Sequence, residues 1–284
     1  KHAGELNRFA ILDCYHNNHP FDIRGAVGEN YLSFGAAYHP YLKTTLQFKI
    51  NTSNLKVIYY RDKEPDRDKN SFASLSSDLQ KLVIDELNNL SPTLPPSSAI
   101  AGVYANTDQA KGVWTAPANV KLSMVEEPTV KITNEEQPQF ITRAPDGKSI
   151  NLIRSFEGKG VLVIGARTLT GNDPEWKYVS MRRLFNMIEE SIARTTRTFI
   201  FDDNNPATWV RIQALIENYL MKLWYAGILQ GAQPEHAFHV RVGLGETMTA
   251  QDIEEGKLII DVGVAPVIPA EFMMFKIVHS MKSK

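Results

Sequence analysis

The chain has 284 residues, of which 43% are apolar and 22% charged, the composition of an ordinary globular protein. Its formal net charge of -1 argues against a nucleic-acid-binding protein held by bulk electrostatics. The single cysteine, Cys14, excludes an intrachain disulfide and a thiolate metal site, and no apolar run approaches the roughly 18 residues of a membrane span. We therefore expect one large or two medium domains, with no nucleic acid bound and no membrane insertion.

The beginning of the chain predicts that a segment is missing. The chain opens on Lys1 rather than methionine, without a signal-peptide pattern, and strand-like sequence arrives by Phe9. We expect a fragment or a processed form whose N-terminal part is absent.

The first third of the sequence predicts short strands and two helices. Residues 9–13 predict a buried strand, and residues 41–50 and 55–60 predict the two arms of a hairpin. Apolar side chains repeat at helical spacing over 72–90, which predicts an amphipathic helix. Ser97 or Ser98 is expected to cap a second helix that Gly112 ends. Residues 120–141 predict loops and edge strands.

Residues 151–183 join a strand, a polar loop and the start of a helix. The apolar run Val161–Ile164 lies between two glycines and predicts a central strand buried on both faces, in a sheet covered by helices. An amphipathic helix is predicted from about Tyr178 to Thr196.

The remaining sequence alternates strands with helices. Strands are predicted at 198–201, 238–242 and 257–264, with a last β-prone run at 271–278. Asn205 followed by Pro206 predicts the start of a helix that Gly227 ends, and Thr249 is expected to cap a short helical turn. Strands interleaved with long helices indicate an α/β fold, with a sheet flanked by long amphipathic helices.

Several motifs invite a catalytic or ligand-binding interpretation, and each has a simpler one. Gly158-Lys159-Gly160 precedes its strand, whereas a phosphate-binding loop follows one. The pairs His16/His19 and His236/His239 lack the third ligand of a catalytic zinc site. We therefore expect no metal and no cofactor.

A serine-hydrolase interpretation would combine Asp13, a histidine, and Ser97 or Ser98. The segment Ser98–Gly102 is faintly similar to the nucleophile segment of subtilisin-like proteases. Helix capping is the simpler role for the two serines, and no histidine lies in a matching glycine-rich setting. We expect no enzyme and no catalytic residue.

Basic residues lie off the apolar stripes of the two long helices. They are Arg182 and Arg183 on the first helix, and Arg211 and Lys222 on the second. They predict either solvated helix surface or docking onto an acidic partner.

Five stretches resemble contractile tail sheath proteins, the family found in phage tails, R-type bacteriocins and phage-tail-like injection systems. The resemblance covers most of the chain after about residue 95, in the family's order, and is looser before residue 90. The five stretches are Pro95–Asn119, Asn151–Leu169, Trp176–Arg194, Trp209–Gly231 and Thr249–Ile277.

The resemblance implies a subtilisin-like sheath domain over 1–174, without a protease's catalytic set, followed by an α+β sheath C-terminal domain over 175–284. It implies stacked six-fold rings that polymerise helically around an inner tube, meet a baseplate, and contract to drive the tube through a target envelope. The subunits would assemble in the bacterial cytoplasm and act in a virion tail or a released particle. The rival interpretations are a degenerate subtilisin-like hydrolase and a soluble binding module.

Two surfaces are expected to serve this assembly. The tube-facing candidates are Arg211 and Lys222, or alternatively Arg182 and Arg183. The C-terminal run is expected to act as an arm that adds a strand to a neighbouring subunit, because Pro266 and Pro269 disfavour a tight hairpin onto 257–264. Its side chains would fill pockets on that neighbour: Phe272, Met273, Met274, Phe275 and Ile277.

Overall fold

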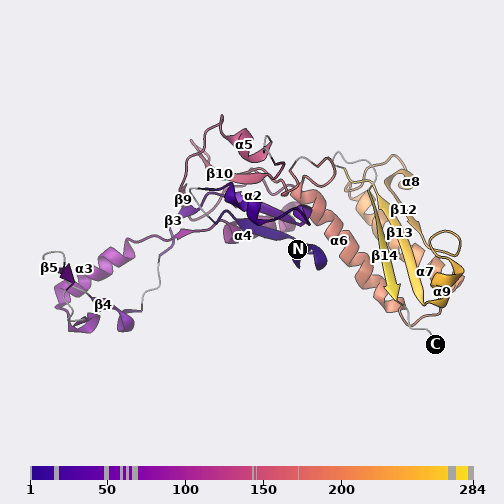
Figure 1. The fold of residues 1–284 in the computed structure, drawn as a ribbon, viewed down its shortest axis with the longest axis horizontal. Helices are drawn as coiled ribbons and strands as arrows, with labels where there is room; N and C mark the ends of the chain where they lie inside the picture. The colour runs from indigo at the N-terminus through magenta and orange to yellow at the C-terminus, as the bar shows by residue number, and fades with distance from the viewer. Residues whose placement is uncertain are drawn as a thin grey trace.

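A computed structural model of the chain describes residues 2–15, 19–47, 51–57, 60–61, 64–65, 70–142, 144, 146–171, 173–267 and 273–280. Three parts follow one another along the longest axis of the molecule (Figure 1). A slender extension lies at one end, a unit around a mixed sheet lies in the middle, and a unit of two long helices and an antiparallel sheet lies at the other end.

The middle unit is built on a four-stranded sheet. Its strand order is β1-β2-β10-β11, in which β1 and β10 run parallel to β2 and β11 runs antiparallel to β10. The strands span Ala10–Asp13, Gly35–His39, Ile150–Phe156 and Gly160–Ile164, in that order. Every residue of β2 is buried, so β2 and β10, and not β11, form the centre of the sheet.

The prediction that Val161–Ile164 is a central strand is therefore wrong. Strand β11 is an edge strand whose residues alternate between buried and half-buried. Its outer edge is covered by the segment 119–122, whose Asn119 and Leu122 amides donate to the carbonyls of Val163 and Val161 at 2.8 and 2.9 Å. A covered edge can carry a continuous apolar run, which is why the run looked central.

Helices cover both faces of this sheet. Helix α4 (Ser97–Lys111) packs Ile100 and Val103 against one face, and α2 (Asp22–Ala26) and α5 (Gln137–Ile141) pack against the other. The predicted α/β class is confirmed, although α5 lies where loops and edge strands were expected. The short helical turns α1 (His2–Glu5) and η1 (Leu32–Phe34) complete this part.

A second, three-stranded sheet carries the extension. Strand β3 (Leu42–Thr44) lies between β8 (Thr93–Leu94) and β9 (Val125–Pro128), and the chain leaves for the extension after β3 and returns before β8. The predicted hairpin between 41–50 and 55–60 is wrong, because β3 pairs with strands distant in sequence. The extension contains β4 (Lys56–Val57), β5 (Tyr60–Arg61), β6 (Glu64–Pro65), β7 (Asn70–Ser71) and the two turns η2 (Thr52–Asn54) and η3 (Phe72–Ser74).

The predicted amphipathic helix of the extension is present as α3 (Ser77–Asn88). No residue of α3 is buried, and Leu79 and Leu82 are 44% and 59% exposed. The periodic pattern gave the helix correctly, but its apolar stripe does not pack onto the core of the middle unit.

The C-terminal unit buries two long helices against an antiparallel sheet. Helices α6 (Val179–Thr196) and α7 (Pro206–Tyr225) pack on the sheet β12-β13-β14, and the short helices α8 and α9 flank β12 and β13. The predicted strand at 198–201 is wrong, because Arg197–Phe199 form the 3₁₀ turn η4. The remaining bounds are Pro234–Ala237 for α8, Phe238–Arg241 for β12, Ala250–Glu254 for α9, Lys257–Val264 for β13 and Met273–Ser280 for β14.

The C-terminal strand β14 is not held away from its own sheet, contrary to the prediction. It pairs antiparallel with β13 at eight positions, from Val264 opposite Met273 to Lys257 opposite Ser280. The predicted arm residues Met273, Met274, Phe275 and Ile277 are in this ladder, and Phe272 lies outside the described residues.

The reason is that neither proline occupies the ladder. Residues 265–272 connect the two strands, a length that reverses the chain without a tight turn. Pro266 bridges Leu229, and the amide of Val267 donates to the carbonyl of Ile228 at 3.1 Å. Residues 265–267 are thus tied to the loop after α7, and β13 pairs with β12 on one side and with β14 on the other.

Local signals at the ends of α7 and α9 match their predictions. The Asn205 side chain accepts the Thr208 amide at 3.1 Å, and Pro206 is the first helical residue. Gly227 follows α7 with φ of 72°, a left-handed conformation that favours glycine. Thr249 and Asp252 form a capping box on α9.

We expect Asn205→Ala to lower the free energy of unfolding by about 1 kcal/mol, because the Thr208 amide loses its acceptor at the helix start. Thermal unfolding followed by circular dichroism measures this. Asn218→Ala, on the exposed middle of α7, is the matched control and should cost nothing. Equal effects of the two changes would contradict the capping role.

Candidate functional site

The structure brings Asp13 and Ser97 into direct contact, at the end of β1 and the start of α4. The Asp13 carboxylate accepts the Ser97 amide at 2.7 Å through Oδ1 and the Ser97 hydroxyl at 2.6 Å through Oδ2. A carboxylate at this position caps the helix and is stabilised by its dipole. The prediction that Ser97 or Ser98 caps α4 is wrong, since neither hydroxyl caps the helix and the distant Asp13 does so instead.

This contact does not have the order of a hydrolytic triad. In a triad an imidazole lies between the carboxylate and the hydroxyl and takes the proton from the nucleophile. Here the serine hydroxyl donates to the carboxylate without an intervening base. The arrangement ties the first strand to α4 and leaves the hydroxyl without the activation that acyl transfer needs.

His39, at the end of β2, is a buried core residue. It is 1% exposed, and its ring stacks on Phe140 with 5.8 Å between centroids and 7° between planes. Burial lowers the pKa of His39 to about 4, so the ring is neutral near pH 7. The neighbouring Cys14 is buried too, and burial raises the pKa of its thiol to about 12.

In the described part of the chain, the other motifs do not assemble a ligand site. Gly158 lies in the turn between β10 and β11 and Gly160 is the first residue of β11, both with positive φ. His239 Nε2 lies 4.0 Å from Asp261 Oδ2 across the sheet, and His236 lies in α8. His16 lies outside the described residues. Among the residues that the structure describes, no three His, Cys, Asp or Glu side chains gather as metal ligands, and no helix is long and apolar enough to cross a membrane.

Arg182 is buried where α6 meets the middle unit. Its guanidinium lies 4.4 Å from the ring centroid of Phe34 and 4.2 Å from that of Trp176. It donates to Asn186 Oδ1 at 2.6 Å and to Glu189 Oε1 at 3.0 Å. Burial lowers the pKa of Arg182, an effect that the carboxylate of Glu189 opposes. The prediction that Arg182 faces the tube is therefore wrong, because its guanidinium is buried and paired inside the molecule.

Arg183 contacts the other side of the same junction. Its guanidinium makes two hydrogen bonds to the Asp108 carboxylate and lies 4.6 Å from the ring centroid of Tyr104. The Tyr104 hydroxyl is 2.8 Å from that of Tyr38, which is buried in β2. Arg183 thus connects α6 through α4 to the central sheet by a bidentate contact, and its role toward a tube stays a prediction.

Arg211 and Lys222 lie on the outer surface of α7. Eleven residues are three helical turns plus about 20°, so the two side chains share one face. Arg211 donates to Asp202 at 3.0 Å and is 64% exposed, and Lys222 is exposed. Val210 and Tyr225, on the same helix, are 66% and 77% exposed. The placement off the apolar stripe is as predicted, and their role toward a tube stays a prediction.

The sequence did not indicate the junction formed by Arg182 and Arg183. Their partners Phe34, Tyr104 and Asp108 precede them by more than 70 residues and come from other elements. Paired basic residues off an apolar stripe are usually solvated, so the pattern pointed to the surface.

The C-terminal part of this chain is similar to known tail sheath proteins. Residues 171–280 match the family model of the phage tail sheath C-terminal domain. The tail sheath protein of Enterobacteria phage T4 is 26% identical over 140 residues, which are 49% of this chain and 21% of that protein.

Solved structures are similar over nearly the whole chain. A chain of the anti-feeding prophage baseplate is 34% identical, with a TM-score of 0.68 and 98% of this chain covered. A chain of the sheath complex of the extracellular contractile injection system PVC, in its contracted state, is 35% identical, with a TM-score of 0.67 and 95% covered. This chain spans 63% of each of those chains. The resemblance to contractile tail sheath proteins is confirmed.

We expect Arg182→Ala to lower the free energy of unfolding by about 3 kcal/mol, because Glu189 and Asn186 lose a buried partner and two aromatic rings lose their stacking cation. Denaturant unfolding measures it. Arg194→Ala, on the same helix, removes a pair that is 77% and 53% exposed and should cost no more than about 0.5 kcal/mol. Similar losses in the two variants would contradict the buried role.

We expect acid to destabilise the chain through His39. Its pKa is about 4 in the folded state, below the value of about 6.5 usual for histidine in an unfolded chain, so the folded state binds fewer protons and stability falls as pH falls from 6.5 toward 4. The contribution lost between pH 7 and pH 5 is about 2 kcal/mol. Urea unfolding across this range should show a smaller loss for His39→Gln. An unchanged pH dependence in that variant would refute the assignment.

Proposed function

We propose that this chain is a structural subunit of a contractile tail sheath, which polymerises helically around an inner tube and contracts to drive the tube through a target envelope. The observation that carries the proposal is its 34–35% identity, over 95% or more of its length, to chains of contractile injection-system assemblies. The match of residues 171–280 to the sheath C-terminal domain supports it independently.

The chain is divided into two domains, residues 1–174 and residues 175–284. The first is a subtilisin-like sheath domain and the second is a sheath C-terminal domain. Separate hydrophobic cores support this division: α4 packs on the central sheet, and α6 and α7 pack on β13. The junction at Arg182 and Arg183 makes the two domains turn as one body, so that contraction rearranges contacts between subunits rather than within them.

The partners are other subunits in stacked six-fold rings, an inner tube protein and a baseplate. The outer face of α7, with Arg211 and Lys222, is the surface offered to the tube, since these two exposed cations lie there beside the exposed side chains of Leu215 and Tyr225. Contacts that contraction must release are better made by screened charges than by a large apolar patch. Assembly takes place in the bacterial cytoplasm, and the product is a virion tail or a released extracellular particle.

The rival functions have less support. A degenerate subtilisin-like hydrolase would need a base at Ser97 or Ser98, but the Ser97 hydroxyl donates to the Asp13 carboxylate and His39 is stacked on Phe140 in the core. We therefore infer that the chain is not an enzyme. A soluble binding module remains the second alternative, and no described cavity favours it over a subunit of an assembly.

We expect particles carrying the native protein to appear in negative-stain electron microscopy as striated tubes around an inner tube, and Arg211→Glu with Lys222→Glu to abolish assembly on that tube. The reversed charges repel the surface that the native side chains attract. Arg194→Glu, on α6, is the control and should assemble normally.

Two outcomes would count against this proposal. Normal tubes from the doubly reversed protein would remove Arg211 and Lys222 from the tube contact. Monodisperse monomers that hydrolyse peptides would replace the sheath function with the enzyme.

A further inference from the structure

A cavity of about 270 Å³ lies beside strands β9 and β10 of the middle unit. Its lining is partly basic and partly apolar, since it contains Lys131 and Arg154 together with Pro128 and Ile132. The exposed Ser155 adds a hydroxyl group. A cavity with this lining suits a carboxylate that is carried on an apolar stem.

The guanidinium group of Arg154 is held in place by neutral groups. Its Nη1 donates to Asn134 Oδ1 at 2.9 Å and to Gln137 Oε1 at 2.6 Å, and its Cζ lies 5.2 Å from the ring centroid of Phe156. No described acceptor takes a hydrogen bond from Nε or Nη2, the two atoms through which an arginine binds a carboxylate by parallel hydrogen bonds. The donors are therefore oriented before a carboxylate arrives, which lowers the entropic cost of binding it.

The described part of the chain does not supply that carboxylate. Neither Arg154 nor Lys131 forms an ion pair with a described residue. Glu127, on β9, is paired with Lys43 at 2.6 Å, and this hydrogen bond lowers the pKa of Glu127 more than Lys131 does. A half-buried guanidinium group without a counter-charge favours an acidic partner.

The exposed face of α3 carries a carboxylate of the required kind. Leu79, Leu82 and Glu86 are spaced by three and four residues, so they lie on one face of the helix. The two leucines are 44% and 59% exposed, and Glu86 is exposed as well. Lys81, by contrast, lies about 140° around the helix axis from Glu86. This face of α3 thus presents one carboxylate with apolar side chains beside it.

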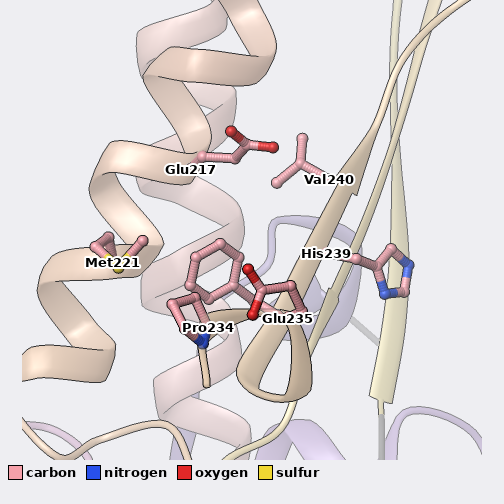
Figure 2. Close-up of a pocket in the computed structure, with 7 residues that line it drawn as sticks. Glu217, Met221, Pro234, Glu235, His239 and Val240 are labelled. Carbon is pink, nitrogen blue, oxygen red and sulfur yellow. The ribbon is translucent and has the colours of Figure 1, made fainter. Parts of the chain in front are cut away.

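A second cavity has the opposite charge. It measures about 290 Å³ and lies between α7 and the start of β12, where Figure 2 shows the carboxylates of Glu217, from α7, and Glu235, from α8. These two carboxylates would repel Glu86. Complementary charge therefore favours the cavity at Arg154 for this contact.

Within its own chain, α3 does not lie over the cavity. The chain returns from α3 to the middle unit through β8, and β3 lies between β8 and β9 in the sheet. The cavity lies beyond β9, where β10 contributes Arg154, whereas α3 lies apart from β9 and β10 at the end of the molecule (Figure 1). Leu79 and Leu82 accordingly remain exposed, and the cavity is open to another molecule.

We propose that the cavity at Arg154 and Lys131 receives the Glu86 side chain of a second copy of the chain, with Leu79 and Leu82 of that copy packed against its apolar wall. The proposal rests on the proposed sheath function, which places many copies side by side. The extension lies at the end of the molecule opposite to the C-terminal unit (Figure 1), so it can contact a neighbouring subunit while α7 faces the tube. Because α3 and the cavity occupy different places on each copy, the contact is heterologous and repeats from subunit to subunit.

Zero-length carbodiimide coupling tests the contact in the native protein. Chains labelled with ¹⁴N and ¹⁵N are mixed in equal parts, assembled, coupled, digested and analysed by mass spectrometry. We expect mixed-isotope peptides that join Lys131 to Glu86, at least about tenfold more abundant than those that join Lys131 to Asp78, which lies about 12 Å away along α3. Glu86→Gln should remove these peptides, and the control Asp78→Asn should leave them unchanged.

A charge exchange gives a second, independent measurement. Glu86→Arg should weaken self-association in sedimentation velocity by at least about tenfold, because it places a cation against Arg154. Adding Arg154→Glu and Lys131→Glu to the same chain should restore the association, whereas Asp78→Arg alone should change it little.

Four outcomes would overturn the proposal: mixed-isotope cross-links no more abundant than those to Asp78, single-isotope cross-links alone, a chain that stays monomeric, or a folded triple variant that does not regain association. Striated tubes without the cross-link between Lys131 and Glu86 would overturn this contact and leave the sheath function standing. Cross-linked oligomers that never form a sheath around a tube would support the contact and overturn the sheath function.

Discussion

Two adjacent arginines at the start of α6 hold the two halves of this molecule together. Arg182 is stacked between Phe34 and Trp176 and neutralised by Glu189, while Arg183 grips Asp108 on α4. A buried charge is tolerated only when it is paired and hydrogen-bonded, so each arginine fixes the position of every partner it needs. Moving α6 relative to the middle unit would separate Arg183 from Asp108 and Arg182 from the ring of Phe34, which is what makes the junction stiff.

That stiffness determines where the molecule can respond to neighbours. A subunit that turns as a whole exchanges contacts on its surface, and the charged outer face of α7 and the acidic cavity beside β12 lie on the unit that α6 positions. The slender extension at the opposite end has a different character, because its helix α3 buries none of its residues and depends on a narrow pair of chain connections at β3 and β8. Stability is therefore concentrated in the two packed units.

The contact between Asp13 and Ser97 shows how catalytic-looking residues can have a structural role. An aspartate at a strand end and a serine at a helix start occupy places where active sites of α/β proteins form. Here the carboxylate satisfies the first amide and hydroxyl of α4 directly. The Asp13 carboxylate and the Ser97 hydroxyl, which could otherwise act in catalysis, hold β1 and α4 together. His39 is buried and its ring stacks on Phe140.

The sequence by itself determined the elements whose signals are local. Helix α7 begins at Asn205-Pro206 and ends before Gly227, and Thr249 caps α9, because capping and left-handed glycines depend on a few neighbouring residues. Only the tertiary structure decided which elements pair and which charges are buried. Strand β11 lies at an edge, β3 pairs with β8 and β9, and β14 returns to β13, since strand partners are chosen by contacts far apart in the chain. The same holds for the contacts of Arg182 and Arg183 with the middle unit: Phe34, Tyr104 and Asp108 lie more than 70 positions away, and helical periodicity carries no information about them.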